Sequence, residues 1–173
     1  MLRLIRRVLD TLYDIGGVIA AFFLIAILLT IVAQMIARWT GNVFPGATSY
    51  AGYFMASASF FALAHTLNHG GHIRVSLMLA ALGRHRRYGE IWCYGIGAVT
   101  ATYFARYGIK ANYWSSKLHD ISQGQDRMPL WIPQIAMSIG TVLLAIALWD
   151  HLVRILLTGH TGVAEPDLTE RAE

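Results

Sequence analysis

The chain has 173 residues, of which 55% are hydrophobic and 14% are charged, and its mean hydropathy is +0.47. This composition excludes an ordinary soluble domain and predicts an all-α integral membrane protein, with no room for a soluble catalytic domain. The formal charge of +4 is small, its distribution fits membrane topology better than nucleic-acid binding, and the lone Cys93 excludes an internal disulfide or a cysteine cluster for zinc or iron-sulfur. We therefore expect a protein that is not an enzyme and holds no cofactor.

Residues 1–14 have an apolar face and a charged face at helical spacing, which is typical of an amphipathic helix that lies along the membrane surface. A signal peptide is the competing interpretation. It is disfavoured because the apolar region that follows has 23 residues, whereas about 7 to 15 are usual in a signal peptide.

Four segments within residues 15–158 are predicted to cross the membrane, because each can reach about 30 Å as a helix at about 1.5 Å per residue. The third segment is charge-free only from Ile91 to Ala105, so we extend it past Arg106 and Lys110, which can snorkel from one end. The fourth is expected to begin as regular helix near Pro133, because prolines interrupt the residues before it. The predicted spans are about residues 15–37, 48–69, 90–114 and 132–150.

Most of the basic residues lie on one side of this arrangement. The amino-terminal segment, the loop at 70–90 and the carboxyl-terminal tail hold nine of the fourteen Lys and Arg residues, so the positive-inside rule predicts that both termini are cytoplasmic. Within the loop, Ser76–Leu82 is predicted to be a second short helix along the membrane surface. The acidic tail, residues 159–173, is predicted to be disordered.

Three histidines, His65, His69 and His72, are spaced so that a continuous helix would present them on one side, as a metal or haem site would require. A Gly pair is expected to end the helix before His72, and no carboxylate lies near in sequence. We therefore favour a structural or hydrogen-bonding role and expect no metal site. A bis-histidine haem that pairs His65 or His69 with His151 stays open.

The spans contain small residues where a transporter would carry ionisable ones. No acidic residue lies inside the charge-free segments and no internal repeat is visible, so transport by this chain alone is disfavoured. Small residues that recur every four positions allow another backbone to approach, and we favour packing among the four helices over packing against a partner. These candidate interface residues are Gly52, Ala56, Gly97, Ala101 and Ala105. The large apolar residues all round the first span suit lipid or a large apolar partner.

Two motifs and the order of the spans resemble those of a known family. One motif is Gly71-His72-Ile73-Arg74-Val75 after the second span, and the other is Gly124 with Pro129-Leu130-Trp131-Ile132-Pro133 before the fourth. With four spans and both ends inside, they resemble the small membrane subunit (DctQ-like) of TRAP (tripartite ATP-independent periplasmic) transporters over about residues 6–157. The family pattern also has an acidic residue where this chain has Thr48-Ser49-Tyr50, and commonly another where Ser76 stands. We therefore assign no role in this chain to the carboxylates that the family has at these positions.

The resemblance implies a non-catalytic subunit of a bacterial inner-membrane uptake system. Its partners would be a large membrane subunit that holds the substrate and sodium sites, a periplasmic binding protein that delivers an organic acid, and the surrounding lipids. The chain would scaffold the large subunit at a fixed depth and tilt and would hold no substrate site of its own. Lys117 and Arg127 are candidates for docking the binding protein, and His72 and Arg74 for a brace after the second span.

Two other functions stay open on the sequence alone. The first is a haem-carrying membrane anchor of a respiratory enzyme, with His65 or His69 and His151 as ligands. The second is a free-standing small exporter, which would have to transport without a companion. A Soret band in the purified protein would favour the haem anchor, and transport by the chain alone in liposomes would favour the exporter.

Overall fold

The computed structural model describes residues 2–69 and 86–158, and in these ranges the chain is helical, with no strand beyond an isolated bridge between Ile121 and Pro129. The helices are α1 (Leu2–Trp39), α2 (Ala47–Asn68), α4 (Arg86–Leu118) and α5 (Trp131–Thr158). The predicted all-α class is therefore confirmed. Outside the described ranges lie the predicted brace residues His72 and Arg74, the predicted surface helix at Ser76–Leu82 and the acidic tail.

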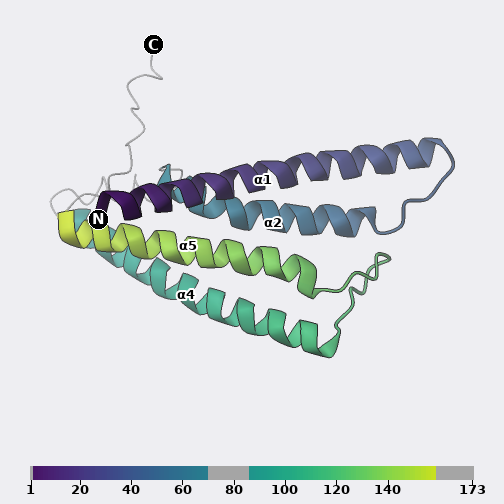
Figure 1. Cartoon of the computed structure of the whole chain (residues 1–173). Helices are drawn as coiled ribbons and strands as arrows, with labels where there is room; N and C mark the ends of the chain where they lie inside the picture. Colours follow the sequence, from purple (N-terminus) through teal and green to yellow (C-terminus); the bar gives the residue numbers. More distant parts are fainter. Residues whose placement is uncertain (1, 70–85, 159–173) are drawn as a thin grey trace, which may run out of the picture.

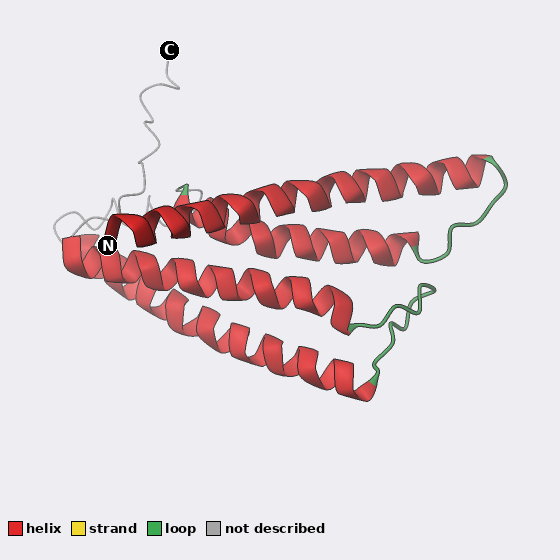
Figure 2. Ribbon diagram, viewed as in Figure 1, coloured by secondary structure: helices red, strands yellow, loops and turns green. Residues whose placement is uncertain are grey.

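The four helices lie side by side in an open layer and do not close into a bundle (Figure 1 and Figure 2). α2 packs against α1 on one side and against α5 on the other, and α4 packs against α5 at the far edge, so the order in space is α1, α2, α5, α4. α1 also touches α5, although this contact is much smaller than the other three. Below, the terminal end of the layer is the end with Leu2, Asn68, Arg86 and Thr158. The loop end is the opposite one, with Trp39, Ala47, Leu118 and Trp131.

α1 is longer than the predicted first span, because residues 2–14 are continuous with it and no helix end separates the two parts. The glycine pair that follows also stays helical, since both glycines lie against α2. A Cβ on Gly16 would be 3.2 Å from the carbonyl oxygen of Phe61, and a Cβ on Gly17 would be 2.9 Å from the ring of His65. These glycines therefore permit close contact between α1 and α2.

Two of the described helices are long and apolar enough to cross a membrane by length and composition, namely Arg6–Trp39 and Trp131–Leu157. α2 and α4 are not among these two helices. α2 contains several Ser and Thr residues, and α4 contains Thr, Tyr and Gly together with Glu90, Arg106 and Lys110. Many of these hydroxyls are nevertheless satisfied locally: Ser57, Ser59 and Thr102 each donate to the carbonyl oxygen four residues earlier, at 2.7–2.9 Å. Such internal bonding is what a helix needs before it enters hydrocarbon.

The buried core is small and lies where α1, α2 and α5 meet. Its centre is a cluster of Tyr13, Ala64, Leu67 and Ala147. Outside this cluster, many large apolar side chains are exposed. In the most apolar 18-residue stretch of α1 only 11% is buried, and in the corresponding stretch of α5 28% is buried. In water such a surface would be unfavourable, so it suits contact with lipid or with a partner.

Candidate functional site

A polar cluster at the loop end joins the α4–α5 loop to the start of α2. We call it the loop-end cluster, and its members are Ser49, Tyr53, Ser122 and Asp126. The Tyr53 hydroxyl is 2.8 Å from Ser122 Oγ and 3.1 Å from Asp126 Oδ2, and Ser122 Oγ donates to Asp126 Oδ1 at 3.0 Å. Burial alone would raise the pKa of Asp126, but hydrogen bonds from Ser122, its own backbone N–H, Tyr53 and Ser49 outweigh burial and lower it.

The loop-end cluster places an acidic side chain, Asp126, beside the first turn of α2, which contains no acidic residue of its own. α2 begins at Ala47 and its N-cap is Gly46, which has φ +80° and makes no side-chain cap. A Cβ on Gly46 would be 2.7 Å from Asp126 Cβ, so the carboxylate stands beside the first turn. A negative charge there interacts favourably with the helix dipole. The fold thus brings an acidic group to the segment where the sequence has none.

The predicted docking residues lie at the loop end. Lys117 is exposed, and its Nζ is 5.4 Å from the ring centroid of Trp114 and 5.9 Å from that of Tyr113. Both distances are within the range of a cation–π contact. Arg127 is also exposed and has a left-handed φ of 45°. The loop end therefore presents two exposed cationic side chains.

The small residues predicted as interfaces have two kinds of surroundings. In α4, Ala101 and Ala105 are buried, and a Cβ on Gly97 would be 3.5 Å from a methyl group of Leu148, so this stripe faces α5. Gly52 in α2 is exposed, and nothing in the described chain lies within 4 Å of the position its Cβ would take. Ala56, one turn further, is half-buried.

Sequence reasoning missed a glycine at the contact of α2 and α5. A Cβ on Gly140 would be 2.7 Å from the backbone carbonyl carbon of Phe60, which makes this the closest approach that a glycine permits between these two helices. A signal was present, because Ala136 and Gly140 repeat the four-residue spacing that singled out Gly52 and Ala56.

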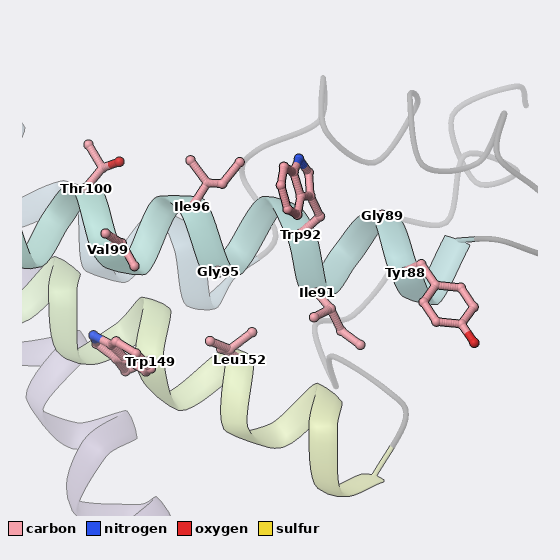
Figure 3. Close-up of a pocket in the computed structure, with 10 residues that line it drawn as sticks. All are labelled: Tyr88, Gly89, Ile91, Trp92, Gly95, Ile96, Val99, Thr100, Trp149 and Leu152. Carbon is pink, nitrogen blue, oxygen red and sulfur yellow. The ribbon is translucent and has the colours of Figure 1, made fainter.

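An apolar groove of about 850 Å³ runs along α4 and α5 near the terminal end (Figure 3). The aromatic and aliphatic side chains that line it are Tyr88, Ile91, Trp92, Ile96, Val99, Trp149 and Leu152. The lining has no charged side chain, and the Trp149 indole N–H is directed elsewhere, to Thr102 Oγ1 at 3.0 Å. The groove can hold hydrocarbon and offers no ionic group to orient a charged solute.

The histidines considered for haem are not among the residues that line this groove. His151 is fully buried, with its ring stacked on Tyr94 at 5.7 Å between centroids. A haem ligand needs an open side toward the iron, so this burial gives the haem anchor no support. His65 and His69 stand at the end of α2, where Asp14 of α1 approaches them. Asp14 is far from both histidines in the sequence, so the sequence around them does not indicate this carboxylate.

A family model described as "Tripartite ATP-independent periplasmic transporters, DctQ component" matches residues 27–158. No curated protein and no solved structure matches the chain. The matched region covers most of the chain, including the whole of α2, α4 and α5. The chain therefore belongs to the DctQ component family of tripartite ATP-independent periplasmic transporters, a family of membrane subunits.

Proposed function

We propose that this chain scaffolds the large membrane subunit of its transporter, and that the assembly takes up an organic acid with sodium from a periplasmic binding protein. The family match supports membership of such a three-part assembly. The open layer supports the scaffolding role, because a single layer of helices has two broad faces, and one can hold a partner while the other faces lipid.

The observation that carries the proposal is the open space beside Gly52, which is exposed on α2. α2 is an inner helix of the layer, yet it exposes a glycine whose Cβ position has no atom of the described chain within 4 Å other than the adjacent residues and backbone of α2 itself. The neighbouring exposed positions on the same side of α2, Met55 and Ser59, complete a stripe at helical spacing. In a membrane, small residues of this kind mark where helices from different chains approach closely.

The test is a large residue at Gly52. We expect Gly52→Leu to leave the isolated chain folded, because the site is open, and to reduce co-purification with the large subunit at least tenfold. The measurement is the amount of large subunit recovered with the chain from co-expressing membranes, after normalisation to the chain itself.

Two controls make this test specific. Gly52→Ala adds little volume and should preserve most of the assembly, while Gly95→Leu changes another open glycine, in the groove outside the predicted interface. Equal recovery for Gly52→Leu and wild type would contradict the scaffold face. The same assay with alanine at His72 and Arg74 tests the predicted brace, which intact assembly would rule out.

We further propose that the loop end docks the periplasmic binding protein through Lys117 and Arg127. Both side chains are exposed and cationic, so an acidic surface on the partner would be attracted to them. Charge reversal at both positions should lower uptake several-fold while the amount of assembled membrane complex stays constant. Uptake by the doubly reversed variant equal to that of wild type would remove the docking role.

A further inference from the structure

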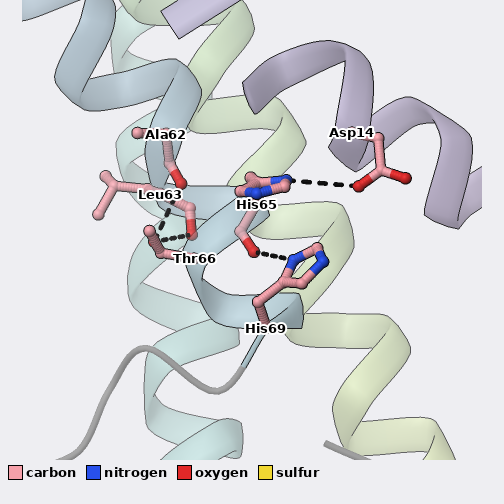
Figure 4. Close-up of polar contacts among 6 residues, drawn as sticks. All are labelled: Asp14, Ala62, Leu63, His65, Thr66 and His69. Atoms are coloured by element: carbon pink, nitrogen blue, oxygen red, sulfur yellow. Dashed lines mark hydrogen bonds and ion pairs between the residues drawn. The ribbon is translucent and has the colours of Figure 1, made fainter. Parts of the chain in front are cut away.

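One carboxylate and two imidazoles from different helices meet at the terminal end of the layer (Figure 4). Asp14 belongs to α1, whereas His65 and His69 stand one turn apart at the end of α2. One ligand atom from each residue lies within 4.8 Å of the other two. Asp14 Oδ1 is 3.4 Å from His65 Nδ1, and the two imidazole rings are 4.2 Å apart between centroids.

The hydrogen bond of His69 determines which nitrogen it can offer to a ligand. Its Nδ1 is 3.0 Å from the carbonyl oxygen of His65. A carbonyl oxygen only accepts, so Nδ1 carries the proton and Nε2 keeps a free lone pair. Metal-binding histidines are typically held in this way, with one nitrogen as the ligand and the other donating to a carbonyl or a carboxylate.

His65 has a buried nitrogen that the described chain leaves unsatisfied. Its Nδ1 has no hydrogen-bond partner there, and the 3.4 Å approach of Asp14 is within ion-pair range but does not meet the geometry of a hydrogen bond. Gly17 of α1 makes room for the ring, because a Cβ at that position would be 2.9 Å from it. A cation between the imidazole and the carboxylate would satisfy both groups.

We propose that Asp14, His65 and His69 bind a divalent transition-metal ion, for which Zn²⁺ is the best fit. Imidazole nitrogen and carboxylate oxygen are both ligands of Zn²⁺ at about 2.0–2.2 Å, whereas Mg²⁺ and Ca²⁺ prefer oxygen ligands. Tetrahedral ligands at that length are about 3.3–3.5 Å apart, so closing the site requires shifts of about 1 Å. Asp14 and His69 are exposed and can make these shifts by rotation of their side chains.

The site would cross-link α1 to α2, with water at the fourth position that three protein ligands leave open. The sequence argued against a metal because no carboxylate lies near the histidines along the chain, and it is the packing of α1 on α2 that brings Asp14 to them. The proposal concerns this chain alone and holds whatever the transported solute is.

The experiment measures Zn²⁺ binding by the full-length chain, purified in detergent without a histidine tag. After equilibrium dialysis against buffered Zn²⁺, metal analysis should find one ion per chain, undiminished by excess Mg²⁺. Asp14→Asn and His69→Gln should each weaken binding at least tenfold. Because Asp14 and His69 are exposed, the metal-free thermal midpoints of the two variants should match that of wild type. Addition of Zn²⁺ should raise the midpoint of wild type but not that of Asp14→Asn or His69→Gln.

His119→Gln is the matched control, because His119 is an exposed histidine that follows α4 at the loop end, opposite the terminal end where the proposed site lies. It should bind Zn²⁺ as wild type does. Wild-type affinity in both Asp14→Asn and His69→Gln, or an equal loss in His119→Gln, would show that the ion binds elsewhere on the surface and would overturn the proposal.

Discussion

Asp126 shows how a single residue acquires its role from the fold, because its carboxylate reaches Tyr53 across 73 positions of sequence. Its hydrogen bonds to Tyr53 and Ser122, and its place beside the first turn of α2, connect the α4–α5 loop to the helix. The local sequence could not indicate this, since an isolated Asp in a polar loop is ordinarily a solvated one. The sequence shows that the loop contains aromatic and charged residues, but it does not show that Asp126 contacts Tyr53 of α2.

Asp126→Asn should lower the thermal midpoint of the purified chain at neutral pH, because it removes the charge that the hydroxyl donors and the helix dipole favour. The folded state lowers the pKa of Asp126, so the carboxylate stabilises the fold above its unfolded pKa of about 3.9. That stabilisation is lost as the pH falls through the lower, folded pKa.

The gap between wild type and Asp126→Asn should therefore persist from pH 7 to about pH 5 and close below about pH 4. Thermal unfolding in detergent across this pH range is the measurement. Asp120→Asn, an exposed change in the same connection, is the control and should leave the midpoint unchanged. A gap of the same size at every pH would mean that the charge of Asp126 does not contribute.

At the scale of helices, the sequence predicted the helical segments that correspond to α1, α2, α4 and α5, whereas it did not predict the neighbours of each helix. Charge-free intervals and apolar composition indicate helices regardless of which surface each one meets. The sequence contains the glycine pair Gly16 and Gly17, but it does not show that α2 packs against this pair. The order α1, α2, α5, α4 depends on such close approaches, which composition does not specify.

Gly140→Ala should destabilise the chain by about 1–3 kcal/mol, the usual cost of overpacking. The new methyl would meet the backbone of Phe60, which cannot rotate away, so α2 and α5 would have to separate. Gly52→Ala is the matched control, since an added methyl there meets nothing and should gain about 0.5–1 kcal/mol through helix propensity. Thermal unfolding in detergent measures both, and a Gly140→Ala midpoint at or above that of wild type would refute the close contact.

At the scale of the whole molecule, the open layer explains why the chain carries so much exposed apolar surface with so small a core. The sequence indicated membrane residence, because bulk composition is enough for that inference. It could not distinguish a closed bundle from an open layer, since both bury small residues at helix contacts. Two of the described helices are apolar enough on their own to cross a membrane. The arrangement of four spans with both termini in the cytoplasm therefore stays a prediction.

Single cysteines test this topology in a Cys93→Ser background. Gln123→Cys, in the α4–α5 loop, should react with a membrane-impermeant maleimide in right-side-out vesicles, because the loop end is predicted to face the periplasm. Arg7→Cys, near the start of α1, should react only after permeabilisation. The Cys93→Ser chain alone should give no labelling, and the reverse pattern at residues 7 and 123 would invert the predicted orientation.

The hydroxyls of Ser57, Ser59 and Thr102 donate within their own helices, and this has a consequence for how the protein is made. A segment whose polar groups are already paired does not have to wait for a neighbour before it leaves the translocon. We therefore expect each hairpin to be released into lipid as the ribosome completes it, so that the layer assembles sideways afterwards through its glycine contacts.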